Sequence, residues 1–180
     1  MTVDIETRWM SDYNRKEART AFSQPGIRYS QAESLIKSLM QDDKFRDLSL
    51  VERKRVTERI LAEIKGRMME DIVLLETKLS KKNCEVFRLQ FAIGEFDMVV
   101  FDPEEETCEI YEIKHSDKIV IQQCRHLLDK QKCEDTAFRY GTIIGKYVIY
   151  CGATTSLVQA GVSTQEDVAY LNVEEYLKKL

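Results

Sequence analysis

The order of apolar and polar residues changes along the chain and predicts which segments form helices and which form strands. The first regular spacing follows a turn signal at Pro25-Gly26. Ser30, with Glu33 three residues later, has the form of a capping box in front of an apolar set. This pattern predicts a helix over residues 31–41.

A second capping box, formed by Ser49 and Glu52, opens a much longer helical pattern. Its apolar residues recur every three or four positions from Val56 to Leu79, which is the spacing of one helix face. From Met68 to Leu75 the segment becomes apolar on nearly every side. We therefore expect one long amphipathic helix whose C-terminal half is buried between other elements.

Three short runs rich in Val, Ile, Phe and Tyr follow the long helix. They cover residues 85–92, 95–102 and 108–115, and brief turns separate them. The second turn contains Pro103 and three successive glutamates, which is typical of an exposed hairpin loop. The runs predict an antiparallel meander.

Helical spacing returns over residues 119–134, and the apolar segment 146–151 then reads as a buried strand. Residues 168–171 are a further strand candidate, and Asn172 is placed to cap a terminal helix over residues 173–180. From the long helix onward the expected order is α-β-β-β-α-β-(β)-α. The predicted fold class is α/β, of the α+β kind.

The length and composition fit one folded domain with an extra arm. The chain has 180 residues, of which 43% are hydrophobic and 32% charged, so a real core can form. We interpret residues 1–48 as a helical extension and residues 49–180 as the domain. No apolar run approaches the roughly 20 residues of a membrane span, and the five cysteines contain no C-x-x-C pair. A reducing, cytoplasmic location is expected.

Charge is sorted along the chain although the net charge is only −4. Residues 44–82 carry eleven Lys and Arg against seven Asp and Glu, whereas residues 83–135 carry six against thirteen. The acidic excess lies in the segment that holds the candidate site. An acidic surface without a bound cation would repel a polyanion such as DNA.

Asp97, Glu112 and Lys114 are the residues that point to chemistry. Side chains two apart on a strand share one face, so Glu112 and Lys114 project together while Ile113 turns to the opposite face. If Asp97 lies on the neighbouring strand in matching register, two carboxylates and an ammonium group converge. Carboxylate oxygens are the ligands that Mg²⁺ prefers.

Such a set suits hydrolysis of phosphodiester bonds, because a cation held by carboxylates activates water and stabilises charge on phosphoryl oxygens. A nearby lysine can position or activate the water, or stabilise the transition state. The E-x-K pattern at residues 63–65 and at residues 76–78 falls on the predicted long helix, whereas at residues 112–114 it falls on a predicted strand. The motif therefore indicates a site only at residues 112–114, where it lies on a strand next to the strand that carries Asp97.

The setting resembles the αβββαβ core of the PD-(D/E)XK nuclease superfamily. GRMMEDIV would supply the glutamate of the first helix, EFD the aspartate of one strand and EIK the final pair, and the resemblance spans about residues 60–151. It implies Glu70, Asp97, Glu112 and Lys114 as the active-site set. The proline of the superfamily's name is absent, since Phe96 precedes Asp97.

The same resemblance implies a metal cofactor and a substrate. Asp97 and Glu112 would bind Mg²⁺ or Mn²⁺, and Gln123 on the following helix would contact a phosphate or a water. The expected substrate is nucleic acid, with DNA favoured. Glu70 has a structural alternative, because a buried carboxylate of this kind can simply pair with an arginine.

A narrower resemblance connects the segments GRMMEDIVLLE, GEFDMVVFD, EIYEIKHS and GKYVIY with the uncharacterised C-terminal domain of a family of prokaryotic AAA-type ATPases. It implies that the chain is a fragment of a longer protein and that the ATPase region is its partner. Members of such families need not be active. Two functions stay open: a metal-dependent nuclease-like domain, and a non-catalytic module that docks the ATPase motor to a partner.

Two histidines and two cysteines raise the alternative of a zinc site. His115, His126, Cys124 and Cys133 lie within one stretch of the chain, but their spacings match no common zinc-ligand pattern. On the predicted helix, residues 124 and 126 point in different directions. Zinc is therefore not expected.

Overall fold

The computed structural model describes residues 25–156 and 168–180, and the chain divides into two compact units, Met1–Ile64 and Lys65–Leu180. The predicted extension over residues 1–48 stays a prediction, and its first 24 residues lie outside the described part. Within the described residues, no helix is both long enough and apolar enough to cross a membrane.

The first unit contains α3 (Pro25–Gln41), α4 (Asp43–Arg46) and the beginning of α5 (Leu50–Ser80). The prediction that the first helix begins at residue 31 is wrong, because α3 begins at Pro25 and Ser30 lies within it. Proline favours the first position of a helix, since its fixed φ suits the helix and its missing N–H would be unpaired there in any case. Pro25-Gly26, which the sequence pattern suggested as a turn, is therefore the start of α3.

The capping box at the start of α5 is confirmed. The backbone N–H of Ser49 donates to Glu52 Oε2 at 2.9 Å, and the N–H of Glu52 donates back to Ser49 Oγ at 3.3 Å. These reciprocal bonds satisfy two of the backbone donors that a helix leaves unpaired at its N-terminus. The long helix is confirmed as well, with 31 residues.

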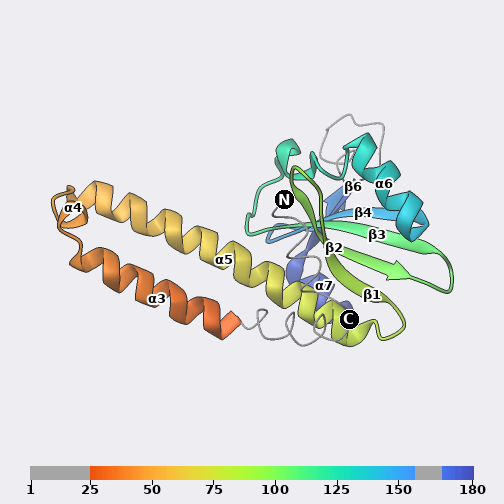
Figure 1. Ribbon diagram of the computed structural model, residues 1–180, viewed down its shortest axis with the longest axis horizontal. Coiled ribbons are helices and arrows are strands. Elements are labelled where there is room, and N and C mark those ends of the chain that lie inside the picture. The colour runs from red at the N-terminus through yellow and green to blue at the C-terminus, as the bar shows by residue number, and fades with distance from the viewer. Residues whose placement is uncertain (1–24, 157–167) are drawn as a thin grey trace. The chain divides into compact units, whose positions relative to one another are not determined.

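The second unit is a mixed α+β structure built on one six-stranded sheet (Figure 1). Its strands lie in the order β1-β2-β3-β4-β6-β5, with β1, β2 and β3 antiparallel and with β4 parallel to both β3 and β6. The predicted meander is therefore confirmed. The strands are β1 (Glu85–Gln90), β2 (Glu95–Asp102), β3 (Thr107–Lys114), β4 (Thr142–Tyr150), β5 (Thr155–Ser156) and β6 (Val168–Asn172).

The helix predicted over residues 119–134 is wrong. That stretch holds the short 3-10 helix η1 (Ile121–Cys124), and α6 (Lys130–Tyr140) begins later. The reason is Asp129, whose carboxylate accepts from the N–H of Lys132 at 3.2 Å and caps α6. The last helix, α7 (Val173–Lys179), is capped by Asn172 as predicted.

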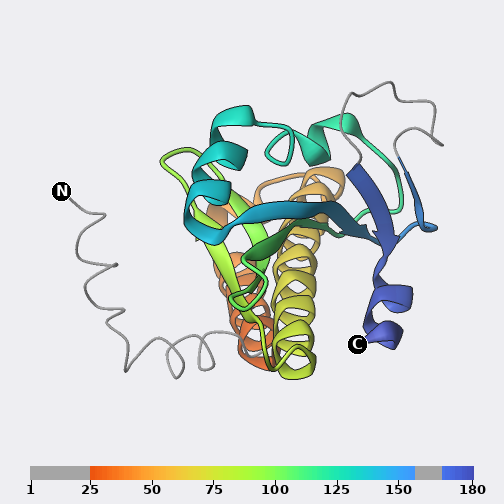
Figure 2. The ribbon, with the colours of Figure 1, turned by 90° about the vertical axis from the view of Figure 1, so that its right-hand side faces the viewer.

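Two apolar layers cover the two faces of the sheet. Helix α6 lies over one face and the C-terminal part of α5 over the other (Figure 2). The predicted burial of the second half of α5 holds for Val73 and Leu74, although Ile72 is 36% exposed. We call the first layer the α6-side core and the second the α5-side core; they contain Phe96, Val99, Ile110 and Val148, and Val73, Met98, Tyr111 and Ile113, respectively.

Candidate functional site

A bulge in β2 positions Asp97. Phe87 on β1 pairs with Val99, but Leu89 pairs with Phe96, so two residues of β2, Asp97 and its successor, face one residue of β1. Phe96 and Val99 consequently both reach the α6-side core although they are three residues apart. Bulges of this kind bend a strand and redirect a side chain.

Asp97 lies where β2 and β3 separate. The last paired residues of the two strands at this end are Met98 and Tyr111. Beyond them, Asp97 Oδ2 accepts the backbone N–H of Ile113 at 2.7 Å. A carboxylate of β2 thus takes the place of a backbone acceptor, and this buried N–H stays satisfied.

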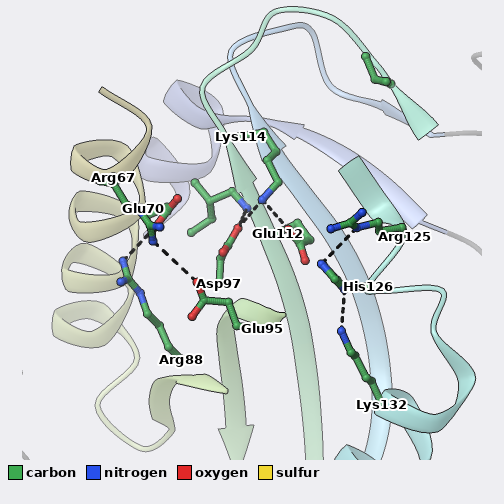
Figure 3. Close-up of polar contacts among 12 residues, drawn as sticks. Arg67, Glu70, Arg88, Glu95, Asp97, Glu112, Lys114, Arg125, His126 and Lys132 are labelled. Carbon is green, nitrogen blue, oxygen red and sulfur yellow. Dashed lines mark hydrogen bonds and ion pairs between the residues drawn. The ribbon is translucent and has the colours of Figure 1, made fainter. Parts of the chain in front are cut away.

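Glu112 and Lys114 join Asp97 at this point (Figure 3). Lys114 Nζ lies 2.9 Å from Asp97 Oδ2 and 2.5 Å from Glu112 Oε2. Ile113 packs in the α5-side core, so Glu112 and Lys114 point to the opposite face, as the strand alternation predicts. The structure therefore brings three of the predicted site residues together.

Burial and a neighbouring charge raise the pKa of the Glu112 carboxyl group. Its residue is 2% exposed, and burial together with the nearby charge of Asp97 raises the pKa of Glu112 to about 8, although Lys114 acts in the opposite direction. Its second oxygen, Oε1, is buried without a hydrogen-bond partner. Burial would lower the pKa of Lys114, but Asp97 and Glu112 together raise it above its ordinary value. Lys114 is therefore charged at neutral pH.

Glu70 is on α5 and is held by two arginines. Its Oε2 lies 3.3 Å from Arg88 on β1 and 3.6 Å from Arg67 one helical turn away. Burial and then the charge of Asp97 raise the pKa of Glu70, so the two carboxylates sense each other. Arg88 also donates to Asp71 at 2.9 Å. Glu70 thus has the arginine pairing that its structural alternative requires, while it lies within electrostatic reach of the site.

Gln123 lies in η1 rather than on a long helix. Its side-chain carbonyl oxygen accepts the backbone N–H of Val120 at 3.1 Å and closes this turn. In this arrangement Gln123 has a local structural role. Its contact with a phosphate or a water stays a prediction.

Asp97 and Glu112 are the side chains in the site that carry ligands suited to a divalent cation. Among the described residues, no group of three or more His, Cys, Asp or Glu side chains is arranged to hold a metal ion. Two buried carboxylates do converge, and Glu112 Oε1 is an unpartnered oxygen donor beside them. Hard oxygen donors of this kind suit Mg²⁺, which commonly binds one or two carboxylates and completes its shell with water and substrate phosphate. Asp97 and Glu112 are therefore the residues that would supply oxygen ligands to such a cation.

Sequence reasoning missed a cluster of cationic side chains beside the site. Arg125 Nε lies 3.3 Å from His126 Nε2, and Lys132 Nζ lies 2.7 Å from His126 Nδ1. The sequence pattern marked His126 only as a possible zinc ligand, and no local pattern connects it with Lys132, six residues later. The thiol groups of Cys124 and Cys133 instead donate to backbone carbonyls.

No family model, curated protein or solved structure matches this chain. The interpretation of the site therefore depends on its own residues.

Proposed function

We propose that the chain carries a metal-dependent nuclease-like domain of the PD-(D/E)XK type, which hydrolyses phosphodiester bonds of DNA. The observation that carries this proposal is the meeting of Asp97, Glu112 and Lys114 where β2 and β3 separate. Two carboxylates at hydrogen-bond distance from one lysine, with a buried carboxylate oxygen left free, make a site suited to chemistry on phosphate.

The order of the elements supports the proposal. Helix α5 is followed by the meander β1-β2-β3, then by α6, and then by β4 parallel to β3. That is the helix, strand and crossover order that the αβββαβ core requires. The element that differs is η1, which precedes α6.

In this function Asp97 and Glu112 would hold Mg²⁺ or Mn²⁺. A cation bound there supplies an activated water and stabilises charge on the phosphoryl oxygens. Lys114 keeps its proton at neutral pH, because its pKa is raised. Its role is therefore that of a cation that orients a water or stabilises the negative charge of the transition state, rather than that of a base.

Glu70 would assist from α5. Arg88 and Arg67 lie beside its carboxylate, and burial followed by the charge of Asp97 raises its pKa. A cation at Asp97 would lower the pKa of Glu70 and favour its charged form. Glu70 could then hydrogen-bond a water near the cation.

The test is calorimetric titration with Mn²⁺, combined with plasmid nicking on the same samples. The wild-type chain is compared with Asp97→Asn and Glu112→Gln, which keep the shape of each side chain but remove its charge. Glu104→Gln is the matched control, since Glu104 is exposed in the turn between β2 and β3. We expect both variants to lose Mn²⁺ binding and nicking while the control keeps them.

The contacts of Lys114 with Asp97 and Glu112 also suit a second function that needs no bound cation. Lys114 contacts both carboxylates, so the cluster is partly charge-compensated by itself, and Phe138 on α6 is 91% exposed. These features suit a non-catalytic module that docks to the ATPase region of a longer protein. A folded wild-type chain that binds no Mn²⁺ and nicks no plasmid would overturn the nuclease proposal in favour of this module.

A further inference from the structure

Two cationic side chains and an imidazole ring gather on one side of the candidate site. Arg125 and His126 lie between η1 and α6, and Lys132 is in the first turn of α6. The imidazole ring stands between the other two, with Lys132 Nζ at 2.7 Å from one ring nitrogen and Arg125 Nε at 3.3 Å from the other (Figure 3). We call these three residues the basic cluster.

Packing contacts hold the side chains of Lys132 and His126 in the basic cluster. Lys132 is only 8% exposed, and its ammonium group lies 5.2 Å from the centre of the Phe91 ring, a cation–π contact that holds it in place. Gly94, in the turn between β1 and β2, lies against the His126 ring, because a Cβ atom built there would be 2.5 Å from His126 Cε1. The ring and the ammonium group therefore have fixed positions.

The charges of the basic cluster are not balanced within the described part of the chain. No ion pair joins Arg125 or Lys132 to a carboxylate there, and the nearby Asp129 uses an oxygen to cap α6. A neutral imidazole carries one N–H and one acceptor nitrogen, so it cannot accept from both cations. Burial, then Lys132, Arg125 and Lys114 in that order, lower the pKa of His126, while Asp129 acts in the opposite direction. An anion placed here would relieve the repulsion.

The basic cluster lies close to the carboxylates. The charge of Lys114 reaches His126, and the charge of Glu112 reaches Cys124, two residues before it in the chain. Glu112 and Lys114 project to the side of the sheet that η1 and α6 cover, and Figure 3 draws the basic cluster beside Glu112. A ligand that spans both places must carry negative charge at one end and a reacting group at the other.

We propose that Arg125, His126 and Lys132 bind a phosphate of the DNA backbone adjacent to the phosphodiester that the Asp97–Glu112 site acts on. The inference rests on the proposed function for its ligand. It also explains how a polyanion can approach an acidic segment, since the basic cluster supplies a local positive charge. Arginine and lysine together suit a phosphate, because both donate charge-assisted hydrogen bonds to its oxygens.

The test measures DNA binding without catalysis. The anisotropy of a short fluorescein-labelled duplex is followed in EDTA over a series of salt concentrations, for the wild type, Arg125→Gln and Arg125→Gln/Lys132→Gln. Each lost phosphate contact reduces the slope of log K against log salt by about 0.9. We expect about a tenfold loss of affinity in the double variant, with a shallower slope. Lys130→Gln is the control, because Lys130 is exposed on the same helix and pairs with Glu134.

Folding of the double variant is checked by circular dichroism, and Arg125→Gln alone is the second variant because Arg125 is exposed. Equal affinity and slope in the wild type and both variants would overturn the inference, as would a wild type that binds no duplex. A wild type that binds inorganic phosphate, with the same loss in the variants, but not the duplex would overturn its assignment to DNA.

The two proposals fail separately. Asp97→Asn should keep duplex binding in EDTA while it loses Mn²⁺-dependent nicking. Nicking by the wild type, with unchanged binding and nicking by Arg125→Gln/Lys132→Gln, would remove the phosphate site and leave the nuclease. Weaker duplex binding by that variant, with no nicking by any chain, would keep the phosphate site and remove the nuclease.

Discussion

The carboxylate of Asp97 accepts the backbone N–H of Ile113 at 2.7 Å and so joins β2 to β3 where their regular pairing has ended. The same oxygen, Oδ2, lies 2.9 Å from Lys114 Nζ. One buried side chain therefore closes the sheet and orders the lysine of the candidate site. The contact with the β3 backbone and the contact with Lys114 depend on the same atom.

Asp97→Ala removes both contacts. It should lower the free energy of unfolding by about 2–4 kcal/mol, because it leaves a buried N–H without an acceptor and Lys114 with one carboxylate fewer. Asp97→Asn keeps an acceptor for Ile113 and should cost only about 1–2 kcal/mol. Urea unfolding measures both values. Equal stability of Asp97→Ala and the wild type would show that the bond to Ile113 contributes nothing.

Glu112→Gln should change how stability depends on pH. The pKa of Glu112 is about 8 in the folded chain against 4.5 for a free carboxyl, so the folded state holds a proton that the unfolded state releases. The wild type is then most stable below pH 4.5 as far as this group is concerned, and it loses stability as the pH rises to about 8. A pKa difference of this size corresponds to a loss on the order of 5 kcal/mol.

Glutamine resembles the protonated form of Glu112 and does not titrate. Glu112→Gln should therefore remove this part of the decline, and the margin by which its stability exceeds that of the wild type should reach its full size above pH 8. Urea midpoints over a pH series give the comparison. Parallel curves for the two proteins would mean that Glu112 titrates normally.

Local sequence rules predicted the elements whose signals lie within a few residues of each other. The reciprocal bonds of Ser49 and Glu52 and the cap at Asn172 need only the residues around a helix end. The three strands of the meander followed from alternation and turns. The pairing of Glu112 with Lys114 on one face followed from the strand period of two.

Other features depend on contacts that short-range patterns do not encode. The bulge at Asp97 arises from the pairing of β2 with β1, so alternation alone could not place it. Arg88 reaches Glu70 across 18 residues of sequence. The helix predicted over residues 119–134 was wrong because apolar spacing continues through a turn, whereas the cap at Asp129 fixes where α6 begins.

Arg88→Met tests the support of Glu70. Arg88 binds Asp71, whose side chain is 4% exposed, as well as Glu70, so its loss withdraws a cation from two acidic groups. We expect a loss of about 1–3 kcal/mol in the free energy of unfolding. Arg67→Met is the matched control, because Arg67 is 47% exposed and lies 3.6 Å from Glu70, and it should cost about 0–1 kcal/mol. Equal effects of the two substitutions would contradict the support that Arg88 gives to the buried Asp71.

Two glycine-to-alanine substitutions should act in opposite directions. Gly94 has φ +79 and faces His126, so alanine there is strained and also collides with the ring. We expect Gly94→Ala to cost about 2–4 kcal/mol and to displace His126, which the imidazole NMR signals would show.

Gly66 lies within α5 with nothing within 4 Å of an added Cβ. Gly66→Ala should stabilise the chain by about 0.5–1 kcal/mol, because alanine favours the helix. Thermal unfolding compares the pair, and a stabilising Gly94→Ala would mean that the turn between β1 and β2 does not fix His126, which would weaken the case for a preformed phosphate site.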